Sequence, residues 1–372
     1  MNNERTVELC FFMKDAYPLF NPSCSGAFGG AEVDLYFLSR ELAKKERYRV
    51  RFFVGDYGQP DVEVIDRVTL VKLKYSDLSK FDKWYHRILR RIYIIKELFF
   101  DTSHVLITKT ASDTLGFMII INKILKRKNV LFKFGSDIDA DPEFWRGKNL
   151  LLYLFYKYSI RFVDYVICQT EAQQKLLDSR LYKKSLVIKN GFPIEKNRDA
   201  GNKEHILWVS RYDYMKRPEI FIKLARSLPR ERFLMVMPGS GEGKSTILSE
   251  IQKTENLTLI DNVPFHLMQD YFNRAKCFVN TSEFEGFPNT FIQACLGSTP
   301  ILSFSVNPDN FINEYSLGCF SHGSLEKAVD FIKCLDEDKI LYYGNNALRY
   351  ATENHDLKNI VTQYEKLINT LR

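Results

Sequence analysis

Short apolar runs alternate with helical patterns along almost the whole chain, and this alternation limits the folds that the sequence can adopt. In the first half, buried strands are predicted at residues 7–13, 50–54, 68–73, 105–108, 130–134 and 165–169. In the second half, they are predicted at residues 186–189, 205–209, 233–237, 257–260, 277–280 and 300–304. Helices are predicted between them, most clearly at residues 31–45, 84–99, 218–227, 268–275 and 289–296. Such alternation is typical of parallel sheets that are wrapped by helices.

The length of the chain indicates two domains. Its 372 residues are too many for one ordinary hydrophobic core. The polar stretch 190–202, NGFPIEKNRDAGN, contains glycine and proline and is the best candidate for a linker. The predicted fold class is therefore α/β, with two Rossmann-like, doubly wound domains at residues 1–192 and 203–355. In such folds ligands bind at the carboxyl ends of the strands, and we expect a cleft between the two domains.

Composition disfavours several classes of protein. Hydrophobic residues make up 45% of the chain and charged residues 27%, as in soluble globular proteins. No run approaches the roughly eighteen apolar residues that span a bilayer, and the first residues do not resemble a cleavable signal peptide. The seven cysteines are scattered without a C-x-x-C pair, and the six histidines show no ligand spacing. We therefore expect reduced cysteines, a cytoplasmic protein and no structural metal.

The stretch 280–300, NTSEFEGFPNTFIQACLGSTP, places an acid and a glycine at the start of a helix. The turn contains Glu285 and Gly286, and the helix is predicted at residues 289–296. Backbone N–H groups and the positive end of the helix dipole favour an anion at such a turn. Gln293 stands on the helix, in the spacing E-x7-Q.

This segment resembles the E-x7-E signature of retaining GT-B glycosyltransferases, especially those of family 4. In that family the first acid binds hydroxyl groups of the donor sugar, the turn binds the diphosphate and the second acid binds the ribose. The resemblance implies that Glu285 contacts the sugar and that Gln293 contacts the ribose. It also implies that four residues lie near the phosphates: Gly286, Phe287, Pro288 and Asn289. Gln293 departs from the family pattern, in which a glutamate is usual, but its amide still offers an acceptor.

A second motif, WVSRYDYMKRP at residues 208–218, follows a predicted strand and precedes a helix. Arg211 and Lys216 match the R-x4-K pair of the family, which implies that they stabilise the diphosphate leaving group. Positive charge suits a leaving group that becomes more negative as the glycosidic bond breaks. In isolation the pair would be interpreted as a solvated basic loop, and Glu285 downstream favours the catalytic interpretation. Arg217 stands where the family often has glycine.

Two glycine turns have a similar interpretation. Gly29 and Gly30 precede an amphipathic helix, and they match a turn that closes over the donor in the family. Gly239 and Gly241 follow a predicted strand, in a segment, MPGSGEGKST, that is similar to a P-loop. Pro238 stands where the P-loop requires its first glycine and removes a backbone donor, so an NTPase is disfavoured. The family resemblance instead implies that this turn lies near the donor.

Two further residues are predicted to lie near a substrate. Asn190 belongs to an N-G pair that resembles the domain junction of the family, although a tight turn needs no ligand. The loop 132–142 lies where many members of the family carry a histidine, and here it offers Asp137 and Asp139 instead. These acids would either orient the acceptor hydroxyl or cap the next helix. Enzymes of this family need no strong base and no required metal, so no cofactor is expected beyond the nucleotide-sugar donor.

Positive charge is concentrated in the first half of the chain. The net charge is +7, and residues 72–100 interleave basic side chains with aromatic and aliphatic ones. A helix that is basic on one face and apolar on the other can lie on an anionic membrane surface. It can equally pack on the sheet and keep its basic face in water. Nucleic-acid binding is disfavoured, because no recognisable module accompanies these residues.

These features predict a retaining glycosyltransferase, cytoplasmic or peripheral to the inner face of the cell membrane. It would move a hexose-type sugar from a nucleoside diphosphate to a saccharide or lipid-linked saccharide, in the synthesis of cell-surface polysaccharide or glycoconjugate. The resemblance also implies that residues 356–372 form a helix that crosses back to the first domain. Two alternatives stay open: a catalytically inactive GT-B partner, and an enzyme similar to nucleotide-sugar epimerases.

Overall fold

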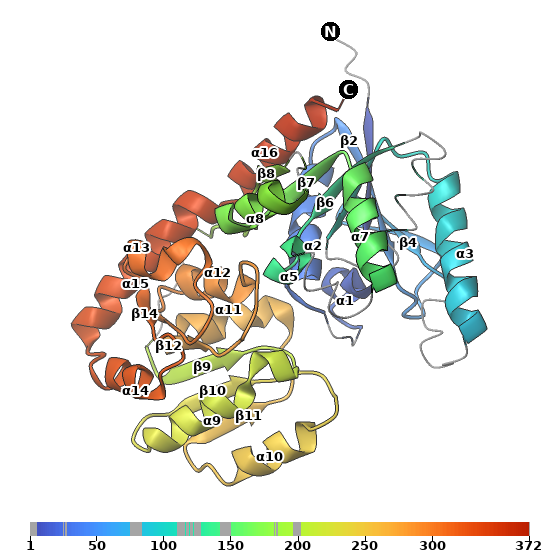
Figure 1. Cartoon of the computed structure of the whole chain (residues 1–372). Coiled ribbons are helices and arrows are strands. Elements are labelled where there is room, and N and C mark those ends of the chain that lie inside the picture. The colour runs from blue at the N-terminus through green and yellow to red at the C-terminus, as the bar shows by residue number, and fades with distance from the viewer. Residues whose placement is uncertain are drawn as a thin grey trace. The chain divides into compact units, whose positions relative to one another are not determined.

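The computed structural model describes residues 6–24, 26, 28–74, 84–109, 116, 119, 122, 128–141, 150–181, 183, 185–195 and 202–371. The chain forms two compact units (Figure 1). The first comprises Met1–Gly191 and Leu357–Arg372, and the second comprises Phe192–Asp356. Each unit is a mainly parallel sheet with helices packed against it, so the predicted fold class of two doubly wound α/β domains is confirmed.

The first unit is built on an eight-stranded sheet in the order β3-β4-β2-β1-β5-β6-β7-β8. All neighbouring strands are parallel except β3, which pairs antiparallel with β4 at one edge. Every position of β5 is buried, as expected for a strand with helices on both faces. The strands are β1 Val7–Phe12, β2 Tyr48–Val54, β3 Val62–Ile65, β4 Val68–Lys72, β5 Val105–Lys109, β6 Asn129–Lys133, β7 Tyr165–Cys168 and β8 Ser185–Val187.

Neighbouring side chains of this sheet pack on opposite faces, as the pleat requires. Phe53 belongs to a hydrophobic cluster shared with helices α3, α7 and α8. Its neighbour Phe52 stacks on Phe11 and contacts Phe20 of α1 instead. The described helices of this unit are α1 Tyr17–Phe20, α2 Gly30–Ala43, α3 Trp84–Phe100, α5 Asp137–Ala140, α7 Leu150–Phe162, α8 Glu171–Leu181 and α16 Leu357–Asn369.

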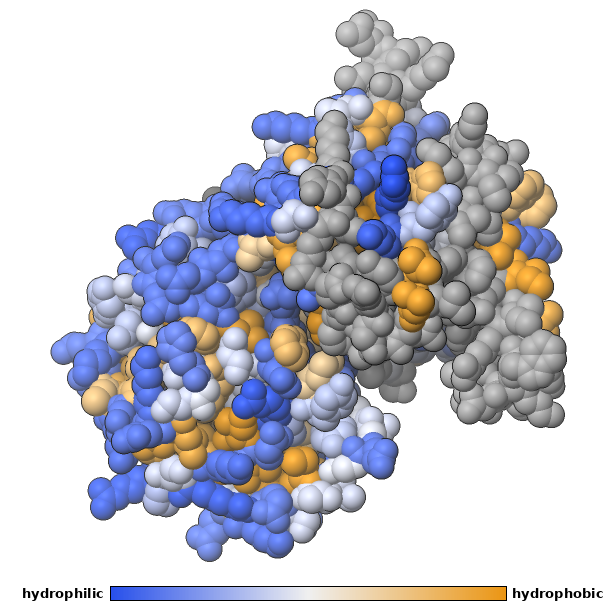
Figure 2. All heavy atoms as spheres, viewed as in Figure 1, coloured by the Kyte–Doolittle hydropathy of each residue, from blue (hydrophilic) through white to orange (hydrophobic). Residues whose placement is uncertain are grey.

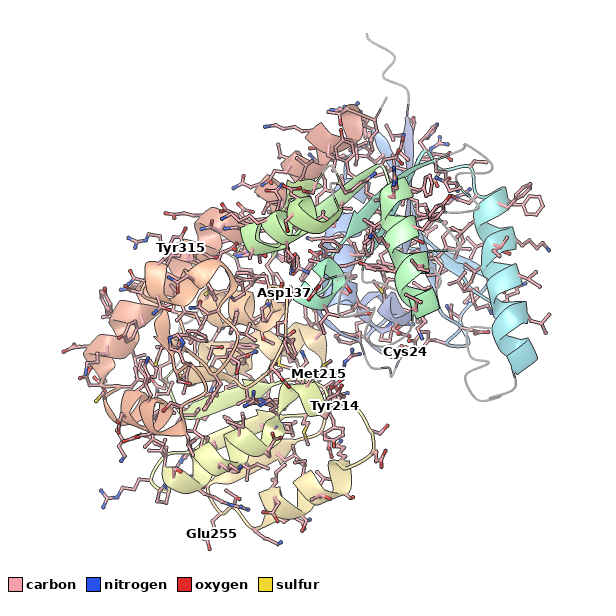
Figure 3. All side chains as sticks on the ribbon, in the orientation of Figure 1. Cys24, Asp137, Tyr214, Met215, Glu255 and Tyr315 are labelled. Carbon is pink, nitrogen blue, oxygen red and sulfur yellow. The ribbon has the colours of Figure 1, made fainter. Side chains whose placement is uncertain are left out.

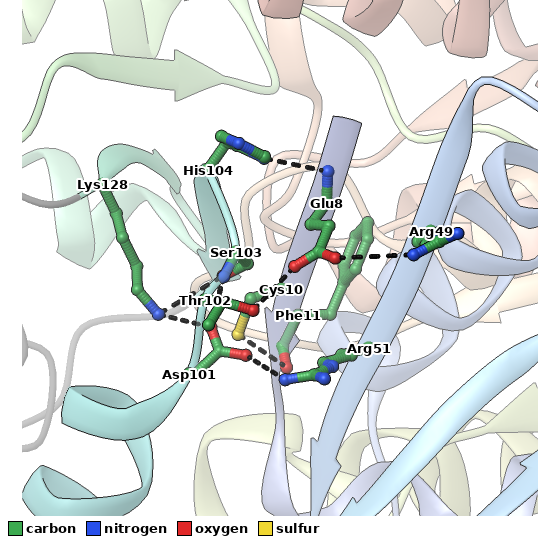
Figure 4. Close-up of polar contacts among 10 residues, drawn as sticks. All are labelled: Glu8, Cys10, Phe11, Arg49, Arg51, Asp101, Thr102, Ser103, His104 and Lys128. Atoms are coloured by element: carbon green, nitrogen blue, oxygen red, sulfur yellow. Dashed lines mark hydrogen bonds and ion pairs between the residues drawn. The ribbon is translucent and has the colours of Figure 1, made fainter. Parts of the chain in front are cut away.

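A charged cluster lies at the amino-terminal edge of the first sheet (Figure 4). The buried carboxylate of Asp101 accepts hydrogen bonds from Arg51 at 3.1 Å, from Lys128 and from Ser103. Burial alone would raise the pKa of Asp101, but the hydrogen bonds from Lys128 and Ser103 outweigh burial and hold the pKa below its ordinary value. Ligands of parallel sheets bind at the opposite, carboxyl-terminal edge. We therefore interpret this cluster as structural.

The second unit is built on a six-stranded, fully parallel sheet in the order β11-β10-β9-β12-β13-β14. Its strands are β9 His205–Val209, β10 Phe233–Val236, β11 Leu257–Ile260, β12 Ala275–Asn280, β13 Ile301–Ser303 and β14 Gly318–Phe320. Its helices are α9 Pro218–Ser227, α10 Lys244–Gln252, α11 Phe265–Asn273, α12 Asn289–Leu296, α13 Phe311–Glu314, α14 Leu325–Lys333 and α15 Glu337–His355.

The last helix, α16, packs on the first unit although it follows the second unit in sequence. Lys45 forms an ion pair with Glu365 of α16 at 2.6 Å, and Asn129 donates to the carbonyl oxygen of Leu371 at 3.0 Å. Gly191 lies directly against this helix, because a Cβ atom there would come within 2.9 Å of the Leu357 side chain. The absence of a side chain at Gly191 therefore allows α16 to approach the main chain.

Two strands of the structure were not predicted from the sequence. β3 has two exposed valines, and β14 is only three residues long, so neither has a clear apolar pattern. The helix predicted at residues 84–99 is present as α3, and residues 75–83 of the basic stretch 72–100 lie outside the described residues. No helix in the described part of the chain is long and apolar enough to cross a membrane.

Candidate functional site

The strand order of the second sheet reverses between β9 and β12. From β9 the chain moves to β10 and β11 on one side, and from β12 it moves to β13 and β14 on the other. The loops that leave these two strands therefore diverge, and open parallel sheets bind their ligands at such a point. The loop after β9 carries Arg211 and Lys216, and the loop after β12 carries Glu285. All three residues predicted to be catalytic thus follow the two strands at the reversal.

Lys216 and Glu285 form a direct ion pair between these two loops. The ammonium group of Lys216 donates to Oε1 of Glu285, and the hydroxyl of Ser282 donates to the same oxygen at 2.8 Å. The two charged side chains are 20% and 19% exposed. Within the described residues, Oε2 of Glu285 has no hydrogen-bond partner. One carboxylate oxygen is therefore fixed, while the other can accept a hydrogen bond from a ligand.

Arg211 is exposed at the end of β9, and its guanidinium makes no ion pair within the described part of the chain. After it, residues Tyr214–Lys216 form one turn of 3-10 helix (Figure 3 labels Tyr214 and Met215). Asp213 caps this turn, because its Oδ1 accepts a hydrogen bond from the main-chain nitrogen of Met215 at 2.9 Å. The capped turn fixes the direction in which the chain enters α9.

Arg217 follows this turn in the left-handed region, with φ 51° and ψ 53°. Glycine adopts that conformation more easily than other residues. The conformation gives a physical reason for the glycine that the resembled family often has at this position. In this chain the side chain of Arg217 also reaches Ser305, to which Nη1 donates at 3.3 Å.

Gln293 lies on α12, in the helix that follows the turn of Glu285. The residue is only 6% exposed, and its main-chain oxygen accepts from Gln269 at 3.0 Å. Its side-chain amide makes no hydrogen bond to any described residue. The amide is not among the buried side-chain groups that lack a partner, so it reaches solvent and can receive a ligand hydroxyl without losing an existing contact.

The turn before α12 is anchored by an aromatic cluster. The side chain of Phe287 is buried and contacts Phe291, Phe311 and Tyr350, and its ring lies 4.8 Å from that of His355. Phe287 therefore faces the core with its side chain, and only its main chain remains for the predicted position near the phosphates. The other predicted residues here, Gly286, Pro288 and Asn289, are buried as well.

The glycine turn after β10 packs against the loop of Arg211. Gly239 has φ +98°, which L side chains rarely adopt, and a Cβ at Gly241 would lie 3.2 Å from the ring of Tyr212. Tyr212 donates its main-chain N–H to Pro238 and its hydroxyl to Glu242, both at 2.8 Å. The two loops are therefore packed against each other through Tyr212.

Lys244, the lysine of the apparent P-loop, is turned onto its own loop. Its ammonium group donates to the carbonyl oxygens of Gly239 at 2.6 Å and Met237 at 3.4 Å. A P-loop lysine instead reaches the phosphates of the nucleotide. This geometry agrees with the argument from Pro238 against an NTPase.

In the first unit, Gly29 and Gly30 begin α2. Gly29 is the N-cap residue, and its main-chain N–H donates to the carboxylate of Glu32 at 2.7 Å. This amide already has a partner, so any contact with a donor would have to compete with Glu32. Both glycines follow β1, one of the two strands between which the order of the first sheet reverses.

The two acids of the loop after β6 differ in burial and in their contacts. Asp139 is buried and caps α5, since its Oδ2 accepts from the main-chain nitrogens of Gly135 at 2.7 Å and Ser136 at 3.3 Å. Asp137 is exposed, and its Oδ1 accepts from Gln173 at 2.9 Å. Helix capping therefore explains Asp139, and Asp137 is the exposed one of the two acids.

Asn190 belongs to a buried network that the sequence did not predict. Lys109 and Lys133 occupy paired positions at the ends of β5 and β6, and both contact Oδ2 of Asp34, at 2.8 and 2.9 Å. Lys109 also donates to the side chain of Asn190 at 3.1 Å. Burial lowers the pKa of Lys133 to about 8. Burial would raise the pKa of Asp34, but the two lysines outweigh it and lower that pKa.

Sequence reasoning also missed Ser282, which orients Glu285. Its signal was present, because the serine stands three residues before the acid in the segment that carries the family resemblance. Among the described residues, no group of three or more histidine, cysteine, aspartate or glutamate side chains could hold a metal ion.

Comparison with known proteins shows that the chain is similar to glycosyltransferases. Residues 192–315 match the family described as glycosyl transferases group 1. One uncharacterized glycosyltransferase of Methanocaldococcus jannaschii is 26% identical over 59% of this chain and 60% of its own length. Another from that organism is 24% identical over 91% of this chain and 90% of its own length. The capsular polysaccharide biosynthesis glycosyltransferase CapH of Staphylococcus aureus is 22% identical, over 77% of this chain and 81% of CapH.

Solved structures show the same fold. Sucrose-phosphate synthase from Thermosynechococcus elongatus has a TM-score of 0.79 at 15% identity, over 98% of this chain and 99% of that chain. TarM of S. aureus has a TM-score of 0.75 at 14% identity, over 98% of this chain and all of that chain. At such identities the likeness concerns the fold alone.

Proposed function

We propose that this chain, whose residues 192–315 match the glycosyl transferases group 1 family and which has the GT-B fold, is a retaining glycosyltransferase. It would move a hexose-type sugar from a nucleoside diphosphate to a saccharide or lipid-linked saccharide. The observation that carries this proposal is the ion pair of Lys216 and Glu285 at the strand reversal, where the loop of Lys216 also carries the exposed cation Arg211.

Each of these groups has a role that follows from its surroundings. Oε1 of Glu285 is held by Lys216 and Ser282, so Oε2 is available to a hydroxyl of the donor sugar. A diphosphate gains negative charge as it leaves, and Arg211 and Lys216 supply the positive charge that stabilises it. Arg211 can engage phosphate oxygens with its planar fork, whereas Lys216 acts as a point charge.

Transfer with retention needs no strong protein base. The bond between the anomeric carbon and the phosphate oxygen breaks, and the acceptor oxygen bonds to the same face of that carbon. The proton of the acceptor passes to the departing phosphate oxygen. The protein then supplies orientation and charge stabilisation, with Asp137 as the proposed group that orients the acceptor. We propose that this chemistry proceeds without a required metal.

The similarity to CapH, a glycosyltransferase of capsular polysaccharide biosynthesis, supports a saccharide acceptor and a role in polysaccharide synthesis. A lipid-linked acceptor would lie at a membrane, and the first unit has exposed apolar side chains on two helices. Leu89, Ile92 and Phe100 of α3, and Leu150, Leu154 and Tyr158 of α7, are between 50% and 68% exposed. Figure 2 shows apolar residues at the surface along α3.

We propose that α3 contacts the inner face of the cell membrane, in agreement with the basic composition of residues 72–100. Co-sedimentation with vesicles of anionic and of neutral lipid tests this part of the proposal. Ile92→Asp should release the protein from anionic vesicles, whereas Leu341→Asp, at an equally exposed leucine of the second unit, should not. Equal binding of both variants would contradict a membrane role of α3.

The enzymatic proposal is tested by thermal stabilisation with a panel of nucleoside diphosphates and their sugars, with and without divalent metal. We expect the nucleotides of one base to raise Tm clearly in the absence of metal. This rise should be lost in Arg211→Ala. Arg230→Ala is the matched control, because Arg230 is an exposed arginine in a loop at the other end of the β9–β10 connection. If no nucleotide changes Tm, the inactive-partner alternative, motivated by Gln293, becomes the better explanation.

A further inference from the structure

A chain of buried hydrogen bonds leads from the core of the second unit to Lys216. The indole nitrogen of Trp208, on β9, donates to the hydroxyl oxygen of Thr281 at 2.8 Å. The hydroxyl of Thr281 in turn donates to the main-chain oxygen of Lys216 at 2.6 Å. Trp208 is 2% exposed and Thr281 is fully buried. Thr281 thus connects a rigid core side chain with the main chain of a residue in the candidate site.

The direction of both hydrogen bonds is fixed by chemistry. An indole N–H can only donate, and a carbonyl oxygen can only accept. The hydroxyl of Thr281 must therefore accept from Trp208 and give its one proton to Lys216. No other residue of the same shape can replace threonine here, because valine offers neither function and would leave both partners unsatisfied in the interior.

The neighbouring residue, Ser282, holds the other member of the ion pair. Its hydroxyl donates to Oε1 of Glu285 at 2.8 Å, and an ionised carboxylate can only accept. The main-chain nitrogen of Ser282 is itself fixed, since it donates to the side chain of Asn280 at the end of β12. The next residue, Glu283, donates its main-chain N–H to the carbonyl oxygen of Met215 at 2.9 Å.

We propose that Thr281 and Ser282 are positioning residues, which set the distance and direction between Lys216 and Glu285. Thr281 fixes the main chain from which the cation projects, and Ser282 fixes one oxygen of the carboxylate. Two adjacent residues at the end of one strand thereby align groups from two different loops. This inference rests on the proposed function, because it assigns the alignment a role in stabilising the leaving group. Small displacements of catalytic groups reduce rates strongly.

The first test compares three threonine variants. Thr281→Val should lower kcat at least 10-fold with a smaller change in KM, because a misplaced cation acts mainly on the transition state. Thr281→Ser retains the hydroxyl and should stay within about threefold of the wild type. Thr254→Val is the matched control: Thr254 is also buried, accepts from Arg226 at 3.0 Å and donates to Glu250 at 2.9 Å.

Thr254→Val should lose stability and keep kcat. If Thr281→Val loses no more kcat than Thr254→Val, or if Thr281→Ser fails to restore it, the positioning role of Thr281 is wrong. For Ser282, Ser282→Ala should lower kcat/KM for the donor at least fivefold. Its control is Ser303→Ala, which removes an equally buried hydroxyl that donates to Val306. Equal effects of these two serine variants would overturn the role of Ser282.

A spectroscopic readout does not depend on turnover. The indole N–H resonance of Trp208, assigned with Trp208→Phe, should move when inorganic pyrophosphate is added to the wild type. The movement should be much smaller in Thr281→Val, because the connection from Lys216 is then broken. An unchanged response in Thr281→Val would contradict the inference. A failure of the proposed function would instead appear in the wild type itself, as an absence of pyrophosphate binding and of transfer.

Discussion

Lys216 donates a hydrogen bond directly to Glu285, so a residue assigned to the diphosphate and a residue assigned to the sugar neutralise each other. The pair joins two loops that leave the sheet in opposite directions. A donor that places its diphosphate near Lys216 and its sugar near Glu285 would meet both charges at once. The ion pair is therefore the most informative place for substitutions.

Lys216→Ala and Glu285→Ala should each reduce kcat about 100-fold or more, which is the usual effect of removing a group that stabilises transition-state charge. Both side chains are only about one fifth exposed, so each substitution leaves one charge unpaired and should lower Tm while the protein still folds. Steady-state kinetics and thermal unfolding check the two expectations. Glu283→Ala, at an exposed neighbouring acid, should keep its activity. Near-normal turnover in either main variant would remove that residue from the mechanism.

Gln293→Glu should lower the stability of the protein without ligand and increase the rise in Tm that a nucleotide causes. A carboxylate at a site that is 6% exposed loses hydration, which should lower the free energy of unfolding by about 1–3 kcal/mol. A carboxylate also accepts stronger hydrogen bonds from ribose hydroxyls. The nucleotide-induced rise in Tm should therefore exceed that of the wild type.

The control for this substitution is Gln252→Glu, at an exposed position of α10, which should behave as the wild type. If the nucleotide-induced rise in Tm is the same in Gln293→Glu as in the wild type, Gln293 does not contact the ribose. A stronger response with no turnover in any assay would favour the inactive-partner alternative.

The buried network of the first unit contains two lysines and one aspartate. Substituting the aspartate should lower the free energy of unfolding more than substituting one lysine. Asp34→Asn leaves two buried cations without a carboxylate, which should cost about 3–5 kcal/mol of unfolding free energy. Lys133→Met leaves one lysine with one aspartate, and should change stability at pH 7 by less than about 1 kcal/mol. Chemical denaturation checks both values, with Lys253→Met as an exposed control.

The pH dependence of stability has a definite sign at Lys133. Its pKa is about 8 in the folded protein against an ordinary 10.5, so the unfolded chain binds more protons between these values. Stability from this group should rise as pH increases from about 8 to about 10.5. Lys203, whose pKa burial also lowers to about 8, contributes with the same sign. The rise should therefore be smaller in Lys133→Met, and identical profiles would contradict the assignment.

Gly191→Ala should loosen α16. The new Cβ would lie 2.9 Å from Cδ1 of Leu357 and 3.2 Å from Cβ of Ile360, so the helix must move. We expect a loss of about 1–3 kcal/mol and faster hydrogen exchange in α16. In a Leu357→Ala background the added cost should be smaller, because the nearest atom is gone. Equal costs in the two backgrounds would show that the contact is unimportant.

Much of the fold could be predicted because its signals are local. The helices Pro218–Ser227 and Asn289–Leu296 and the strands His205–Val209 and Leu257–Ile260 have the predicted bounds, since a proline, a glycine or a polar residue adjoins each apolar run. β3 could not be predicted, because it is an edge strand formed by a hairpin. The turn of that hairpin depends on positive φ angles at Asp66 and Arg67. The sequence pattern around these residues does not predict such angles.

In the candidate site too, features with a local sequence signal could be predicted, and contacts between distant segments could not. Arg211, Lys216 and Glu285 could be proposed from the sequence because each belongs to a contiguous motif. Pairing between Lys216 and Glu285 was not predicted, since it depends on β9 and β12 being neighbours in the sheet. Burial of Lys133 was not predicted either, because lysine is almost never fully buried and nothing nearby in the sequence indicates its partner Asp34.

Because α16 packs on the first unit, the two units are completed in a fixed order while the chain is synthesised. The second unit is one continuous segment, Phe192–Asp356. All of its residues are therefore present once Asp356 has been added to the growing chain. The first unit lacks α16 until residues 357–369 follow, and until then the surface around Gly191 and Lys45 has no partner. Domains commonly fold in the order in which they are synthesised. Here the unit that opens the chain is completed last.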